Sequence, residues 1–113
     1  MTSLRATADS TLLSIKDLSM HVTMRYYTNA SALGDAMAAK TDEVRKLISE
    51  VPGFIAYYAI RNGDVVTSVT VCKDKAGTDE TTKRAREWVK ENVKGGVTPP
   101  GINEGDTFVS FNK

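Results

Sequence analysis

The chain begins its regular pattern with alternating apolar and polar residues from Met20 to Thr28, which predicts a half-buried strand. A helix follows that Ser31 or Asn29 can cap, and Pro52-Gly53 ends it. Its apolar residues recur every three or four positions: Leu33, Met37, Val44, Leu47, Ile48 and Val51.

A β-hairpin is predicted next, from Phe54 to Arg61 and from Val65 to Lys73, with Asn62-Gly63 as a two-residue loop. In that register Ile60 faces Val65 and Tyr58 faces Thr67. This side of the hairpin is the more apolar one, so we expect it to pack on the helices. The opposite, more polar side then carries Tyr57, Ser68, Thr70 and Cys72.

A second helix is predicted to begin at Asp74 or Thr78 and to end at Gly95-Gly96. Its narrow apolar stripe includes Trp88, which we assign to the core, and its many charges predict a solvated face with local ion pairs. After a Pro-rich loop, alternation from Thr107 to Phe111 predicts a final strand.

The resulting order β, α, β, β, α, β predicts an α+β, ferredoxin-like fold. Right-handed crossovers give a four-stranded antiparallel sheet in the order four, one, three, two, with two helices on one face. The other face is expected to be bare and to need a cover, most simply a second copy around a two-fold axis. The apolar residues that we assign to it are Ile55, Tyr57, Ala59, Val66 and Tyr27.

Residues 1–19 lack a clear period, so we divide the chain into an N-terminal extension, 1–19, and one domain, 20–113. A short helix capped by Ser10 is compatible with the extension, and Asp9, Lys16 and Asp17 interrupt any secretory signal. The extension is either a leader that the fold does not need or an arm that packs on a partner subunit.

Composition narrows the class of function. The net charge is +1, without the basic excess that attracts nucleic acid, and 41% of the residues are hydrophobic and 26% charged, as in ordinary globular proteins. No apolar run approaches the length of a membrane span, so we expect no membrane partner. The single cysteine excludes an internal disulfide, and one His with one Cys cannot form a Cys/His zinc site, so we expect a cytoplasmic protein without a metal.

Three stretches resemble a known family: Val51-Pro52-Gly53-Phe54, Tyr57-Tyr58 and Lys73-Asp74-Lys75-Ala76. Over residues 20–112 the chain resembles the antibiotic biosynthesis monooxygenase-like group of the dimeric α+β barrel superfamily. The resemblance implies a homodimer in which two sheets pair face to face as a barrel. It also implies a place among cofactor-independent quinol or polyketide monooxygenases, haem-degrading enzymes and proteins of no assigned activity.

The chain departs from that family at two positions. Many catalytic members carry a Trp late in the third strand and a His early in the second helix. Here Val71-Cys72-Lys73 and Thr81-Thr82-Lys83 stand at those places. The departure argues against haem degradation but leaves room for an oxygenase that acts on a substrate which itself reacts with oxygen.

The candidate substrate-binding residues follow from alternation along the strands. One face of the sheet is predicted to carry His21, Thr23, Arg25, Tyr27, Tyr57, Ser68, Thr70 and Cys72. His21 and Cys72 either form a thiolate–imidazole pair or serve as a rim residue and a small buried hydrophobe. Arg25 needs a carboxylate, a partner subunit or an anionic ligand, and no residue is singled out as catalytic.

Two functions remain open at this stage. The first is a homodimeric barrel that binds a small, partly aromatic molecule and acts as a cofactor-independent monooxygenase. The second is a non-catalytic dimeric module for ligand binding or assembly, which the missing Trp and His and the few titratable groups favour.

Overall fold

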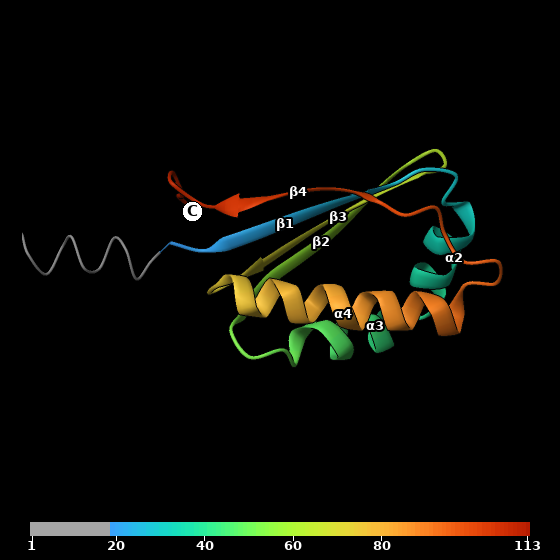
Figure 1. The fold of residues 1–113 in the computed structure, drawn as a ribbon, viewed down its shortest axis with the longest axis horizontal. Coiled ribbons are helices and arrows are strands. Elements are labelled where there is room, and N and C mark those ends of the chain that lie inside the picture. The colour runs from blue at the N-terminus through green and yellow to red at the C-terminus, as the bar shows by residue number, and fades with distance from the viewer. Residues whose placement is uncertain (1–18) are drawn as a thin grey trace, which may run out of the picture.

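The computed structural model describes residues 19–113. They form a single antiparallel sheet with helices along one face (Figure 1). The strand order is β2-β3-β1-β4, which confirms the predicted order and the α+β, ferredoxin-like class. The predicted N-terminal helix lies outside the described residues. In chain order, the elements are β1 (His21–Tyr27), α2 (Ser31–Ala39), α3 (Thr41–Ser49), β2 (Phe54–Asn62), β3 (Val65–Cys72), α4 (Lys75–Asn92) and β4 (Gly101–Asp106).

The first predicted helix is two helices, α2 and α3, which meet at Lys40. Lys40 leaves the helical region, with φ −123° and ψ 37°. The Thr41 hydroxyl donates to the carbonyls of Met37 and Ala38, both at 3.1 Å, and so satisfies acceptors that the end of α2 exposes. The apolar spacing continues through this break, which is why the pattern alone predicts one helix.

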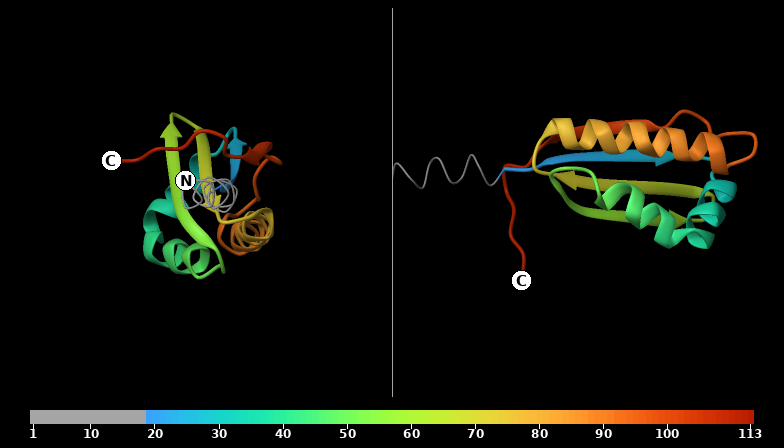
Figure 2. Two further views of the ribbon diagram at one scale, coloured as in Figure 1. Left: turned by 90° about the vertical axis from the view of Figure 1, so that its left-hand side faces the viewer. Right: turned by 90° about the horizontal axis from the view of Figure 1, so that it is seen from below.

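Helix α4 agrees closely with its prediction. The Asp74 side chain caps it, with Oδ1 accepting from the Gly77 N–H at 3.1 Å. Trp88 is buried, and its indole N–H donates to Glu43 of α3 at 2.8 Å, which holds the two helices side by side under the sheet (Figure 2). No helix in the described range is long and apolar enough to cross a membrane.

The β2–β3 hairpin turns one residue later than predicted. Asn62 pairs with Val65, so the loop is Gly63-Asp64, and Tyr58 faces Val69 rather than Thr67. Gly63 has φ 61°, which suits the glycine required at the first central position of a type II′ turn. A bulge at Ile55 then shifts the register between Phe54 and Ala56.

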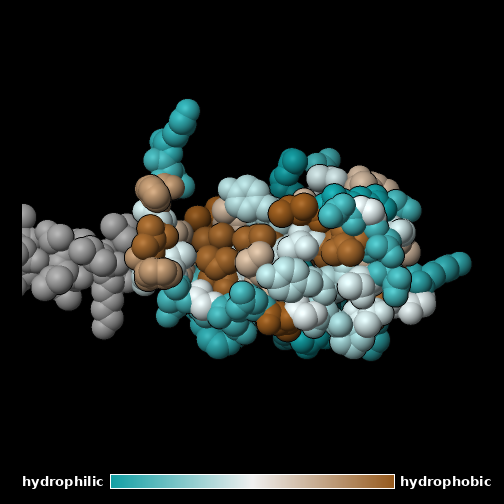
Figure 3. Space-filling model, turned by 90° about the horizontal axis from the view of Figure 1, so that it is seen from above, coloured by the Kyte–Doolittle hydropathy of each residue, from teal (hydrophilic) through white to brown (hydrophobic). Residues whose placement is uncertain are grey.

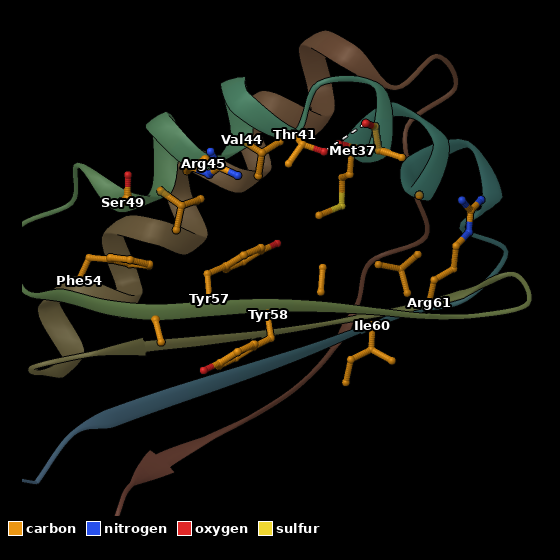
Figure 4. A pocket seen from close by; sticks show the side chains of 16 residues that line it. Met37, Thr41, Val44, Arg45, Ser49, Phe54, Tyr57, Tyr58, Ile60 and Arg61 are labelled. Atoms are coloured by element: carbon orange, nitrogen blue, oxygen red, sulfur yellow. Dashed lines mark hydrogen bonds between the residues drawn. The ribbon is translucent and has the colours of Figure 1, made fainter. Parts of the chain in front are cut away.

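The prediction of which sheet face packs on the helices is wrong. Tyr27 and Val66, assigned above to the bare side, lie in the core with Trp88, and Tyr57 also points towards the helices (Figure 4). The exposed side, which we call the open face, holds the more apolar set, and hydrophobic surface gathers there (Figure 3). By register it carries Val22, Met24, Tyr26, Tyr58, Ile60, Val69 and Val71.

The final strand is Gly101–Asp106 rather than Thr107–Phe111. It pairs with β1, and the ladder ends where the Thr107 N–H donates to the Met20 carbonyl at 2.8 Å. Phe108 and Phe111 are 96% and 82% exposed beyond it. Alternation predicted the wrong segment because an edge strand needs only its backbone groups to pair, so it need not bury side chains.

Candidate functional site

A groove of about 620 Å³ opens between β2 and the helices α2 and α3 (Figure 4). Tyr57 points from β2 into the groove, whereas Tyr58 points to the other side of the sheet. Apolar side chains dominate the lining, and among the described residues Arg45 and Arg61 are its charged members. Among the lining residues are Met37, Val44, Ile48, Phe54, Tyr57, Ala59 and Val66.

The eight predicted site residues share one face of the sheet, but it is the face that the helices cover rather than the open face. Three strands bring them together in register: His21 faces Cys72, Thr23 faces Thr70, and Arg25 faces Ser68. Tyr57 faces Thr70 from the other neighbouring strand. All of them are buried except Tyr57, which is half-buried.

Arg25 is the most unusual of these residues, because its side chain is only 2% exposed. Its Nη1 donates to the hydroxyl of Thr82 on α4 at 2.7 Å. Within residues 19–113, its Nε has no hydrogen-bond partner, and neither does the hydroxyl of Ser68 or that of Thr70. Buried polar groups are nearly always bonded, so these three atoms lack hydrogen-bond partners that they would be expected to have.

A small cavity of about 30 Å³ lies beside Arg25, and Ser68 and Tyr57 also line it. Several side chains line both this cavity and the large groove, Tyr57 and Met37 among them. The buried guanidinium therefore stands behind the inner wall of the groove.

Tyr57 is a neutral phenol in this setting. Burial raises its pKa above the ordinary value of 10.0, and the nearby Arg25 guanidinium only partly opposes this rise. At physiological pH the Tyr57 hydroxyl can therefore donate a hydrogen bond into the groove.

The thiolate–imidazole pair considered for His21 and Cys72 does not form. The His21 ring nitrogens lie 2.8 Å from a Glu104 carboxylate oxygen and 2.9 Å from one of Asp106. Burial, with the charge of Asp74, raises the pKa of the Cys72 thiol, so it stays protonated. His21 fastens β4 to β1, and Cys72 fills space as a small apolar residue.

Sequence reasoning missed three contributors to this region. Thr82 was noted only as standing where family members have a His, yet it is the hydrogen-bond acceptor of Arg25. Glu104 and Asp106 lie in a segment predicted as loop. A search for carboxylates that could neutralise His21 would have found these two, since both lie within three residues of the start of the predicted strand.

In the part of the chain that the structure describes, no group of three His, Cys, Asp or Glu side chains is placed to hold a metal ion.

No protein-family model matches the chain, and no curated protein matches its sequence. Solved structures do match. A candidate antibiotic biosynthesis monooxygenase from Bordetella bronchiseptica is 14% identical, with a TM-score of 0.62 over 80% of this chain and 99% of that one. A dimeric ferredoxin-like protein from an uncultured marine organism is 14% identical, with a TM-score of 0.62 over 86% and 95%.

A monooxygenase from Streptomyces coelicolor, the product of ActVA-Orf6 solved in complex with the ligand nanaomycin D, is also similar. It is 17% identical, with a TM-score of 0.55 over 84% of this chain and 91% of that one. At these identities the matches establish the fold. The chain thus has the fold of antibiotic biosynthesis monooxygenase-like proteins, as the sequence resemblance predicted.

Proposed function

We propose that this protein binds a small, partly aromatic molecule in the groove beside β2 and oxidises it as a cofactor-independent monooxygenase. The groove is the observation that carries the proposal, because its 620 Å³ lies in the usual size range of small-molecule sites. Its apolar lining suits an aromatic body, and the Tyr57 phenol suits a carbonyl or hydroxyl group. The fold is shared with the nanaomycin D-bound monooxygenase from Streptomyces coelicolor.

The reaction needs no cofactor when the substrate supplies the electrons. In an anthrone, the ring CH₂ group loses two hydrogens and gains one oxygen atom of O₂ as a carbonyl, and the second oxygen atom leaves as water. Tyr57 would donate its O–H to the substrate oxygen that becomes negative as the substrate's proton passes to solvent at the open side of the groove. The apolar side chains around it would exclude water and strengthen that hydrogen bond.

The groove itself favours substrates that lose a proton easily. Among the described residues that line it there is no carboxylate, histidine or cysteine, and the raised pKa of Tyr57 keeps its phenol protonated, so a substrate that is itself acidic suits the groove best. Quinols and anthrones meet this requirement because their anions are delocalised over aromatic rings.

Oxygen consumption with a panel of quinols and anthrones tests the proposal. Replacing Tyr57 with Phe should lower kcat/KM about tenfold or more, since one hydrogen bond to a charged group is lost. Tyr58→Phe is the matched control, because Tyr58 is the next residue on the strand and, although it borders the groove, its phenol points to the other side of the sheet. Oxygen consumption no faster than in buffer would contradict the oxygenase.

A non-catalytic ligand-binding module is the second candidate. The absence of a general base from the described groove lining favours it. Mass spectrometry of small molecules that copurify with the protein, followed by incubation in oxygen, separates the two candidates. A ligand recovered unchanged after incubation supports simple binding.

We propose further that the working unit is a homodimer joined through the open face. Tyr58 and Ile60, on this face, are 61% and 56% exposed. Large apolar side chains that gather on one exposed face usually mark a binding surface. A second copy is the simplest occupant, since a dimeric protein of the same fold exists. With a net charge near zero and one cysteine, we place this dimer in the cytoplasm and expect no nucleic-acid partner.

A further inference from the structure

Building on the proposed small-molecule function, we propose that the groove's ligand is an aromatic carboxylic acid, and that its carboxylate binds Arg25 behind Tyr57. Nothing in the fold resemblance points to an acid. The proposal comes from the buried cation and from the hydroxyl groups around it.

The first step is the electrostatic position of Arg25. A guanidinium carries five N–H donors and stays charged at every physiological pH. At 2% exposure, Arg25 has little contact with water. Within residues 19–113 it donates one hydrogen bond, to the neutral Thr82 hydroxyl. A charge removed from water in this way needs a counter-charge, because desolvation costs several kcal/mol.

The second step is the identity of the neighbouring groups. By hydrogen-bond geometry, neither the Ser68 hydroxyl, in register with Arg25, nor the Thr70 hydroxyl, in register with Tyr57, has a partner within the described residues, although Ser68 lies close enough to the Tyr57 phenol to oppose in part the rise in its pKa that burial causes. Ser68 lines the small cavity beside Arg25, so Arg25 Nε and the Ser68 hydroxyl are donors that a ligand there would meet. A carboxylate accepts about four hydrogen bonds and also neutralises the guanidinium, whereas a ketone or an amide oxygen accepts two and neutralises nothing.

The third step is access. The cavity beside Arg25 measures about 30 Å³, so it suits a small head group such as a carboxylate and is too small for an aromatic ring. Tyr57, Met37 and Val44 line both this cavity and the groove. The two spaces therefore share a wall, and in our proposal the acid places its head group at Arg25 and leaves its aromatic body in the apolar groove.

Calorimetric titration of the full chain with 2-naphthoate and with its neutral analogue 2-naphthamide tests the proposal. The unmodified protein should bind the acid about ten- to a hundredfold more tightly than the amide, the range expected for charge-assisted hydrogen bonds. Arg25→Met should remove this preference and leave the amide's affinity unchanged. Arg86→Met is the control, because Arg86 lies exposed on α4, and it should keep the full preference.

The melting temperature of Arg25→Met without ligand gives a second readout. If Arg25 serves a ligand, removing an unpaired buried charge should leave the melting temperature equal or higher. A fall of several degrees, together with unchanged naphthoate binding, would show that Arg25 has a structural partner and would overturn the proposal. Equal affinity of the unmodified protein for acid and amide would overturn it without any variant.

The two proposals fail in different ways. Turnover of neutral anthrones that depends on Tyr57, without a preference for acids, would retain the oxygenase and reject the carboxylate site. Tight binding of naphthoate that depends on Arg25, without oxygen consumption by any quinol or anthrone, would retain the carboxylate site and reject the oxygenase.

Discussion

Single polar residues beneath the helices fall into two kinds, and the difference separates structural from binding roles. Both His21 ring nitrogens bond to carboxylates of β4, so the side chain is fully used in holding the sheet edge. Arg25 is buried as deeply, yet one hydroxyl is its only hydrogen-bond partner in the described chain. A buried polar group with hydrogen-bond partners stabilises the fold, whereas one without them destabilises it unless a ligand binds there.

His21 predicts a specific pH dependence of stability. Burial alone lowers its pKa, but the hydrogen bonds to Asp106 and Glu104 outweigh burial and raise the pKa above the ordinary 6.5. The bond to His21 in turn lowers the pKa of Glu104 below its ordinary 4.5. The stabilisation is therefore complete between about pH 4.5 and 6.5, and it fades as pH rises through the folded pKa of His21 or falls through that of Glu104.

The measurement is the melting temperature of the unmodified protein and of His21→Gln from pH 4 to 9. The gap between them should be widest at pH 5 to 6 and should narrow towards pH 9. His21 is the only histidine in the chain, so no other imidazole adds to the signal. A gap that widens with rising pH would show that His21 is neutral in the folded protein.

At the level of elements, local chemistry was predictable from the sequence and pairing was not. The Asp74 cap and the existence of the β2–β3 hairpin depend on neighbours in the chain, and both predictions are confirmed. The helix break at Lys40 and the position of β4 depend on partners far away in the sequence. Apolar periodicity continues through the helix break at Lys40 and is absent from β4, so it could predict neither feature.

The hairpin loop offers a test at this level. Gly63 has φ 61°, a conformation that costs other residues about 1–2 kcal/mol, so Gly63→Ala should lower the free energy of unfolding by that amount. Gly105→Ala is the control, because Gly105 has an ordinary φ and open space where a Cβ would lie. Urea unfolding at one fixed protein concentration measures both. An equal decrease in the free energy of unfolding of the two variants would show that a side chain at position 63 does not strain the turn.

For the whole molecule, the sequence predicted which residues share a sheet face but not which face the helices cover. Strand alternation alone places Arg25, Ser68 and Tyr57 together, and the structure confirms this. The choice of face was made from hydrophobicity, on the premise that the more apolar side is the core. That premise holds for an isolated domain and fails when the apolar side is open and the covered side holds buried polar side chains such as Arg25 and Ser68.

The assembly therefore gives the broadest prediction. If the open face joins two copies, Ile60→Arg should place two charges in an apolar interface and convert the dimer to a monomer, because unpaired charges are costly there. Ile102→Arg is the matched control: Ile102 is 51% exposed, close to the 56% of Ile60, and its register with Arg25 puts it on the other side of the sheet. Sedimentation velocity at micromolar concentration should show a dimer for the unmodified protein and for Ile102→Arg, and a monomer for Ile60→Arg. A monomer already in the unmodified protein would mean that the open face is covered in another way, with residues 1–19 as the remaining segment of the chain to delete and test.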